Sequence, residues 1–259
     1  MRVIDLSGKV ALVLGVANKR SLAWAISESL GEAGASLAFT YQGERMEKNV
    51  KKLAQEFPKA PIMACDVTSE EQMDGVFARI DKQFGKLDIL VHSIAYARRQ
   101  ELEGSYVKTA LQGWRIALEV SAFSLLKLAE RASPLMKRAG GGSIVAMTYL
   151  ASQRVVPKYN VMGAAKAALE HGVRQLASEL GPHNIRVNAI SAGPISTLSA
   201  RGISGFTGMA AHHRRVAPLR RDVERREVGD AALFLCSDLA SGITGEILFV
   251  DAGFNIMGV

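Results

Sequence analysis

The chain has 259 residues, of which 48% are hydrophobic and 22% charged, and its formal net charge is +7. This size and composition are ordinary for one large α/β domain with its own core. No apolar stretch is long enough to span a bilayer, and the amino-terminal segment lacks a signal-peptide architecture. We therefore expect a cytoplasmic protein without membrane insertion.

The two cysteines, Cys65 and Cys236, both lie within apolar runs. This placement predicts buried thiols in a reducing cytosol and argues against a disulfide. The adjacent residues His212 and His213 would point different ways on a helix or on a strand. Because no Cys/His cluster has the spacing of a zinc site, no metal is expected.

Seven short segments, several of them continuously apolar, are predicted to be strands: 10–14, 36–41, 62–64, 89–92, 143–148, 186–190 and 246–250. Continuous apolar runs are typical of strands buried on both faces of a parallel sheet. Amphipathic stretches such as 22–33 and 70–84 lie between them. The alternation predicts a Rossmann-like, doubly wound parallel sheet of about seven strands, flanked by helices in one domain over residues 1–259.

The first strand leads into a glycine-containing loop, LGVANKRSLAWAI, that opens a helix. Gly15, Ala17 and Ser21 are small at positions where a backbone would approach a pyrophosphate, and Ser21 is placed to cap the helix. The pattern departs from G-x-G-x-x-G, and many loops of this kind are merely tight turns that bind no ligand. Its position after the first strand favours dinucleotide binding.

The second strand ends at Gln42, where an acid would bind a ribose 2′-hydroxyl and a basic pair would bind a 2′-phosphate. Because Gln42 is neutral, NADH is favoured. Lys19, Arg20 and Arg45 lie close enough in sequence to keep NADPH open.

Two further loops follow the third and fourth strands. Asp66 could bond an adenine amino group, or it could cap a helix that begins near Ser69. Ser93 and Ala95 would let the chain pass close to a ribose or a nicotinamide, since ligands of open sheets bind at this edge. The alternative for this fourth loop is a plain turn.

Tyr149, Tyr159 and Lys166 lie within the stretch TYLASQRVVPKYNVMGAAK. If 160–180 is a helix, Tyr159 and Lys166 are nearly two turns apart and point into one site. A nearby ammonium would favour the phenolate and orient the hydroxyl toward a developing oxyanion. Taken alone, the pair could equally be a helix-start aromatic and a solvated charge.

Much of the basic excess lies late in the chain, in HHRRVAPLRRDVERRE. Such a stretch can attract nucleic acid, a membrane or an acidic protein, or it can be a solvated helix face. Because no nucleic-acid-binding motif or aromatic interleaving accompanies it, we expect no nucleic-acid binding.

Taken together, the predicted sheet, the loops and the Tyr–Lys pair resemble the short-chain dehydrogenase/reductases. Three features depart from the usual member: Tyr159-x6-Lys166 in place of Tyr-x3-Lys, the loop GVANKRS, and Ser121 in EVSAFS where a catalytic Asn is usual. All three match the bacterial NADH-dependent enoyl-acyl-carrier-protein reductases, as do LAFTYQ, YNVMGAAKAALE, RVNAISAGPI and FLCSDLASGITGEILFVDAGF. Ser196 is a local departure, since many relatives carry a basic residue there.

The resemblance implies reduction of the trans-2 double bond of an enoyl thioester with NADH. Tyr159 would stabilise the enolate oxygen, Lys166 would bind the nicotinamide ribose, and Tyr149 would line the pocket. In this reaction charge appears on the thioester oxygen, farther from the nicotinamide than in a ketone reductase. A changed Tyr–Lys offset is a plausible way to move the hydroxyl accordingly.

The resemblance also implies the remaining site residues. Ile195 would contact the nicotinamide amide and Thr197 the pyrophosphate. The full cofactor set is Gly15, Ala17, Ser21, Leu22, Gln42, Asp66, Val67, Ser93, Ile94, Ala95, Lys166, Ile195 and Thr197. The substrate set is Ala97, Tyr149, Tyr159, Ile203, Phe206 and Met209.

Residues 198–213 contain three glycines between apolar side chains, which argues against a firm helix. We expect a flexible substrate-binding loop, a small lid whose apolar side chains cover an acyl chain. The fold implied by the resemblance makes this lid helical. An acidic acyl carrier protein is the implied partner, and Arg201, Arg214, Arg215 or Arg220 could steer it to the pocket mouth.

A homotetramer is also implied, and the apolar carboxyl end, residues 242–259, could pack between subunits. Two alternatives stay open. A 3-oxoacyl thioester or ketone reductase of the same superfamily is disfavoured by the Tyr–Lys spacing and the missing Asn. A catalytically silent, cofactor-sensing protein is disfavoured by the intact Tyr, Lys and cofactor loops.

Overall fold

The computed structural model describes residues 4–197 and 205–258. Seven strands form one sheet in the order β3-β2-β1-β4-β5-β6-β7, and every neighbouring pair is parallel. The strands are β1 (Val10–Leu14), β2 (Ser36–Tyr41), β3 (Ile62–Ala64), β4 (Ile89–His92), β5 (Gly142–Thr148), β6 (Ile185–Ala192) and β7 (Ile247–Val250). The order reverses between β1 and β4, which is the switch point of a doubly wound sheet.

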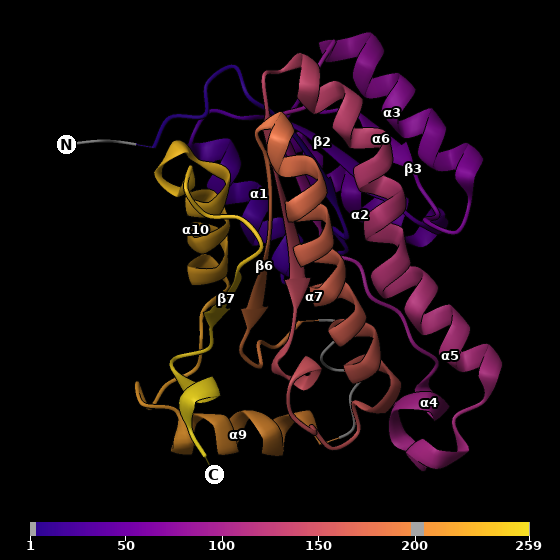
Figure 1. Cartoon of the computed structure of the whole chain (residues 1–259), viewed down its shortest axis with the longest axis vertical. Coiled ribbons are helices and arrows are strands. Elements are labelled where there is room, and N and C mark those ends of the chain that lie inside the picture. The colour runs from indigo at the N-terminus through magenta and orange to yellow at the C-terminus, as the bar shows by residue number, and fades with distance from the viewer. Residues whose placement is uncertain (1–3, 198–204, 259) are drawn as a thin grey trace.

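Helices cover both faces of the sheet (Figure 1). One face packs against α1 (Leu22–Glu32), α2 (Gly43–Leu53) and α10 (Arg225–Cys236). The other packs against α3 (Glu70–Phe84), α6 (Ser124–Arg138) and α7 (Asn160–Leu180). Ala11 and Val13 of β1 enter the first core, whereas Leu12 and Leu14 enter the second. This alternation explains why a strand buried on both faces is continuously apolar.

The carboxyl ends of the strands point toward the lower edge of Figure 1, where α4 (Arg99–Glu103) and α9 (Phe206–Val216) lie. Helix α5 (Leu111–Leu118) continues through a π-helical turn, η3 (Glu119–Phe123), into α6. The short 3₁₀ turns are η1 (Ala54–Glu56), η2 (Tyr106–Lys108), η4 (Leu150–Ser152), η5 (Gly181–His183), η6 (Asp238–Ala240) and η7 (Phe254–Ile256).

The predicted fold class and all seven predicted strands are confirmed, with end shifts of one or two residues in the last three. The helices predicted at 70–84 and 160–180 match α3 and α7 residue for residue. The prediction that 198–213 holds no firm helix is wrong from Phe206 onward, because α9 begins there and runs through Gly208. His213 of α9 is buried, and its ring Nε2 forms a hydrogen bond with the Asp251 carbonyl oxygen. This packing outweighs the low helix propensity of Gly208.

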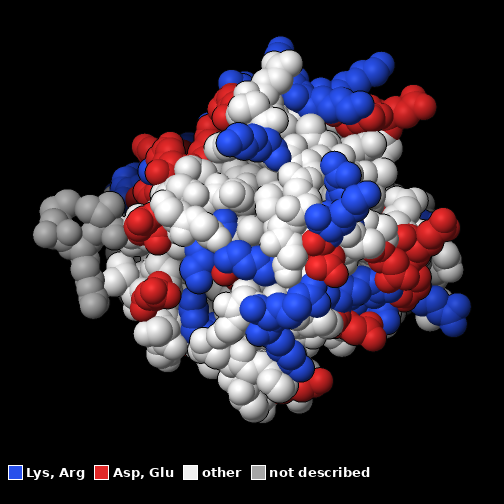
Figure 2. All heavy atoms as spheres, turned by 90° about the horizontal axis from the view of Figure 1, so that it is seen from above, with Lys and Arg blue, Asp and Glu red and all other residues white. Residues whose placement is uncertain are grey.

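Ile203 and Arg201, both predicted to act at the substrate site, lie outside the described residues. No described helix has the length and hydropathy needed to cross a membrane. Nor do residues 4–197 and 205–258 contain a group of three or more His, Cys, Asp or Glu side chains suited to a metal ion. Figure 2 shows the face at the amino ends of the strands, where Lys and Arg side chains are interspersed with Asp and Glu.

Candidate active site

A cavity of about 720 Å³ opens at the carboxyl ends of β1, β4, β5 and β6. Ligands of open α/β sheets bind at this place, next to the switch point. Of the residues predicted for the cofactor and the substrate, all that the structure describes line this cavity except Asp66. Residues far apart in the chain thus meet in one site, as the strand order requires.

Gly15 lets two loops approach at the floor of the cavity. Its φ is +98°, and a Cβ built there would lie 2.0 Å from the carbonyl oxygen of Ser93. The Ser93 amide in turn donates to the Leu14 carbonyl oxygen at 3.2 Å. Only glycine fits this conformation and this distance, so the turns after β1 and β4 form one continuous surface.

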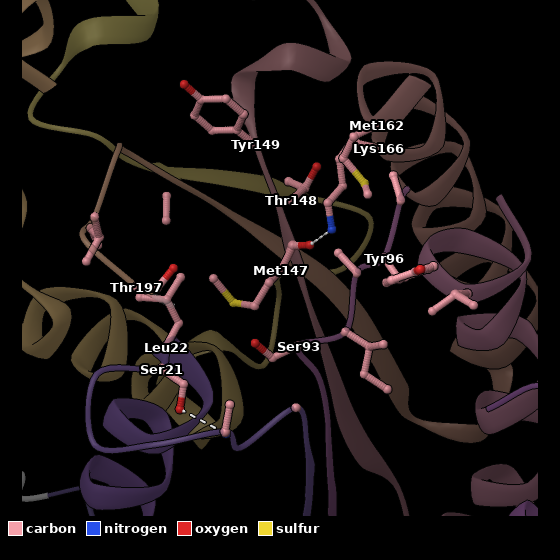
Figure 3. A pocket seen from close by; sticks show the side chains of 18 of the residues that line it. Ser21, Leu22, Ser93, Tyr96, Met147, Thr148, Tyr149, Met162, Lys166 and Thr197 are labelled. Carbon is pink, nitrogen blue, oxygen red and sulfur yellow. Dashed lines mark hydrogen bonds between the residues drawn. The ribbon is translucent and has the colours of Figure 1, made fainter. Parts of the chain in front are cut away.

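The loop after β1 is closed by Ser21, at the lower left of Figure 3. Its hydroxyl donates to the carbonyl oxygen of Asn18 at 2.7 Å and accepts from the Ala17 amide at 3.5 Å. Ser21 occupies the N-cap position of α1, yet no described side chain caps that helix. The Trp24 amide donates to the Ser21 carbonyl oxygen at 3.1 Å, which leaves the Leu22 and Ala23 amides for an anionic ligand. The glycine-lined cradle and this helix start therefore fit a dinucleotide pyrophosphate.

Asp66 and Gln42 interact with each other. The Gln42 side-chain amide donates to Oδ2 of Asp66 at 2.8 Å, and Oδ1 of Asp66 accepts from the amide and hydroxyl of Thr68. The side chain of Ser69 caps α3 by accepting from the Gln72 amide, so the alternative that Asp66 caps this helix is wrong. Gln42 lines the cavity directly.

Lys166 is buried on α7, and its Nζ donates to the carbonyl oxygen of Met147 at 2.7 Å (Figure 3). Burial lowers the pKa of Lys166 to about 8, and the charge of Glu170 opposes that shift. His92 lies buried at the end of β4, with Nε2 at 2.8 Å from the Ser124 hydroxyl. Burial and the Lys166 charge lower the pKa of His92 to about 3, so its ring is neutral at physiological pH.

Tyr149 and Tyr159 pack edge to face, with ring centroids 5.0 Å apart. Burial, and then the neighbouring Tyr149, raise the pKa of Tyr159 well above its ordinary value. Burial and Asp251 raise the pKa of Tyr149 to about 12. The expectation that Lys166 favours the phenolate of Tyr159 is therefore wrong, because the effect of desolvation dominates. Tyr149 and Tyr159 are both neutral hydrogen-bond donors.

Helix α9 supplies the outer wall of the cavity. Phe206 and Met209 are three residues apart, so they share the helix face that lines it. The Tyr149 hydroxyl donates to the Met209 sulfur at 3.3 Å. His213 on the same helix is buried whereas His212 is exposed, which confirms that the adjacent histidines point different ways.

Ser121 is a site residue that the sequence identified only as the replacement for an Asn. It is fully buried in η3, where its hydroxyl accepts from the Tyr96 amide at 3.0 Å and donates to the Tyr96 carbonyl at 3.2 Å. It thereby fixes the loop after β4. π-Helical turns are common at functional sites, but no residue pattern in this sequence predicts the turn at 119–123.

The sequence analysis also missed several lining residues, including Thr40, Tyr96, Met147, Thr148 and Met162. A spacing argument could have found Met162, because it stands between Tyr159 and Lys166 at the three- and four-residue steps of one helix face. Met147 and Thr148 follow from the end of β5, once the sheet edge is known to form the site.

A family model described as Enoyl-(Acyl carrier protein) reductase matches residues 15–255. The enoyl-acyl-carrier-protein reductase (NADH) FabI of a Nostoc species is 50% identical over 260 residues, which cover 99% of this chain and all of that protein. Its namesake from Bacillus cereus is 49% identical, over 98% of this chain and 99% of that protein.

Solved structures agree with these relatives. The Bacillus cereus enoyl-acyl carrier protein reductase, with NADP+ and indole naphthyridinone, matches with a TM-score of 0.95 and 48% identity, over 98% of this chain and 99% of that chain. The enoyl-(acyl-carrier-protein) reductase of Anaplasma phagocytophilum, in complex with NAD, matches with a TM-score of 0.94 and 42% identity, over all of this chain and 98% of that chain.

Proposed function

Because the chain belongs to the enoyl-(acyl carrier protein) reductase family, and reduces enoyl-acyl-carrier-protein thioesters with NADH, we propose that Tyr159, Tyr149 and Lys166 form its catalytic group. The reaction is the last reductive step of the fatty acid elongation cycle. The observation that carries the proposal is the single cavity that joins these three side chains to the glycine-lined cradle. When bound, NADH supplies the hydride that adds to the β carbon of the substrate.

Tyr159 acts on the thioester oxygen. Charge develops on that oxygen as the β carbon is reduced, and a neutral phenol held in the cavity can donate a hydrogen bond to it. The raised pKa of Tyr159 keeps the proton on the phenol. Tyr149 packs against the Tyr159 ring and bonds Met209, so it lines the pocket and restricts the ring that carries the donor. The α carbon takes its proton from water or through a proton relay.

Lys166 binds the nicotinamide ribose hydroxyls and brings positive charge to the site. Its contact with the Met147 carbonyl oxygen fixes the ammonium at the cavity wall. On the adenosine side, Gln42 lines the cavity, whereas Lys19, Arg20 and Arg45 do not belong to its described wall. A neutral side chain at that place favours NADH over NADPH.

Turnover of two substrates separates this function from its main alternative. Loss of reduced-nicotinamide absorbance is followed with crotonyl thioester and with acetoacetyl thioester, each with NADH and with NADPH. We expect oxidation of NADH by the crotonyl substrate and little by the other pairs. Turnover of the oxo substrate alone would assign the chain to the ketone reductases, and no turnover would favour a silent cofactor-sensing protein.

We also propose that exposed arginines near α9 steer the acidic carrier protein to the cavity. Arg214 pairs with Asp222 at 2.6 Å, so the exposed residues Arg215 and Arg220, which form no salt bridge with a described carboxylate, are the better candidates. Arg215→Glu should raise KM for the carrier-bound substrate and leave KM for a short thioester unchanged. Lys137→Glu, on α6, is the control, and equal KM values in both variants would contradict the steering.

We also propose that the protein is a homotetramer and that it lies in the cytoplasm. Exposed apolar side chains support association, among them Leu111 on α5, Phe123 on η3 and Ile256 near the carboxyl end. Free, buried Cys65 and Cys236 suit a reducing compartment. Sedimentation equilibrium should give four times the chain mass, and a monomer at micromolar concentration would contradict this assembly.

A further inference from the structure

Glu170 is a buried carboxylate that the proposed mechanism does not use. Its side chain is only 3% exposed, on the face of α7 that turns toward the end of β5. Acidic side chains are almost never buried to this extent unless hydrogen bonds or an opposite charge satisfy them. Glu170 accepts two hydrogen bonds, and the charge of Lys166 lies one helical turn away, so both sets of neighbours lead to a proposed catalytic side chain.

The hydrogen bonds of Glu170 enclose Tyr149. Thr148, the last residue of β5, donates from its hydroxyl to Oε1 of Glu170 at 2.7 Å. Ser152, the last residue of η4, donates to the same oxygen at 2.5 Å. Tyr149 lies between these two donors, so one carboxylate oxygen fixes both ends of the short segment that carries the ring.

The charge of Glu170 acts on Lys166. The two residues are four apart on α7, a spacing that brings side chains together on one helix face. The Lys166 charge acts on the His92 ring on β4, and the phenols of Tyr149 and Tyr159 line the same cavity as Lys166; all three groups are neutral at physiological pH. Among the described residues, Glu170 is thus the anion that offsets the burial of the ammonium.

We propose that Glu170 is a positioning residue with two effects: it places Tyr149 through Thr148 and Ser152, and it keeps Lys166 protonated at working pH. It touches neither substrate nor cofactor and acts only through these neighbours. The inference rests on the proposed roles of Tyr149 and Lys166. A positioning role differs from a merely structural one in its consequences: loss of the Glu170 charge must change the pH dependence of NADH affinity, whereas loss of its hydrogen bonds must change kcat.

Two variants separate the two effects. Glu170→Gln keeps the shape and the carbonyl acceptor but removes the charge, so the pKa of Lys166 should fall by about one unit. The alkaline loss of NADH affinity, followed by fluorescence titration from pH 6 to 10, should then move down by about one pH unit, with affinity at pH 6 unchanged. Thr148→Val combined with Ser152→Ala keeps the charge, so it should lower kcat about tenfold without moving that pH limb.

The outcomes decide each part. An unmoved alkaline limb in folded Glu170→Gln would overturn the effect on Lys166, and an unchanged kcat in the double variant would overturn the placement of Tyr149. If Glu170→Gln does not fold, Glu170→Asp keeps the charge on a shorter side chain and should reproduce the double variant; a shifted limb there would contradict the inference. An absent alkaline limb in the unsubstituted protein would overturn the proposed role of Lys166 itself, and the inference with it.

Discussion

The two walls of the cavity are built in different ways. The wall after β1 and β4 is made largely of backbone, where Gly15 lets the Ser93 carbonyl approach and Ser21 closes the loop. The wall formed by β5, α7 and α9 is made of long side chains, held by buried polar contacts such as Lys166 with the Met147 carbonyl oxygen. The first wall sets the shape that a cofactor meets, and the second sets the chemistry.

The two walls should respond differently to substitution. A backbone wall has no rotamers to rearrange, so one added atom should remove cofactor binding as a whole. A side-chain wall can lose a single interaction and keep its shape, so its variants should change kcat, KM or pH dependence separately. Each of the following substitutions tests this contrast.

Gly15→Ala should have the largest effect. The new Cβ would meet the Ser93 carbonyl oxygen at 2.0 Å, so one of the two loops must move and NADH affinity should fall more than about a hundredfold. Gly8→Ala is a matched control, because Gly8 also has a positive φ, +77°, but a Cβ there meets nothing within 4 Å. Calorimetric titration with NADH measures both. Equal affinities in the two variants would show that the close approach is not needed.

Lys166→Met should weaken NADH binding by about 10- to 100-fold, since a buried charge-assisted contact is lost while the stem is kept. In the unsubstituted protein the pKa of about 8 places the ammonium form below pH 8 and the neutral form above it. NADH affinity and kcat/KM should therefore be retained up to about that pH and then fall. A profile that stays flat to pH 10 in the unsubstituted protein would contradict this assignment.

Ser121→Ala should have a smaller effect, about tenfold on kcat/KM, because it leaves the partly buried amide and carbonyl of Tyr96 without their partner. Ser133→Ala, on the outer side of α6, is the control and should be neutral. Steady-state kinetics with crotonyl thioester makes the measurement. A Ser121→Ala enzyme that matches the control would mean that the loop after β4 does not depend on this clamp.

Met209→Leu should have the smallest effect, about threefold on the substrate KM, because it keeps the volume and removes only the sulfur that accepts from Tyr149. Thr207→Ala, exposed on the same helix, controls for changes in α9 itself. A large loss of kcat in Met209→Leu would instead make this contact part of the chemistry.

The sequence predicts most of the fold, the Tyr159–Lys166 pair and the loops that form the cofactor side of the cavity. Buried parallel strands read as apolar runs, and the Tyr159–Lys166 spacing placed both residues on one face of α7, which the cavity confirms. Strand order then brings loop residues such as Gly15 and Ser93 to one edge. These inferences needed only local patterns and the topology of a doubly wound sheet.

The remainder depends on packing that a linear pattern does not carry. Ser121 and Glu170 matter through partners 25 residues and 22 or 18 residues away, and a buried polar residue has no sequence signature. The pKa of Tyr159 was misjudged for the same reason, since burial is a property of the folded site. The resemblance implies a helical lid, but the residues themselves do not predict helix α9, because Gly208 has low helix propensity and the anchor at His213 exists only in the folded structure.

The most direct test of the account is a comparison of Tyr159→Phe with the unsubstituted protein in single turnover of crotonyl thioester, with NADH affinity measured on the same samples. Removal of one oxyanion donor should lower the rate by about 100- to 1,000-fold. NADH affinity should be unchanged, because the cradle at Gly15 and the contact of Lys166 are intact. An unchanged rate in the folded variant would contradict the assignment of Tyr159 as the donor to the thioester oxygen.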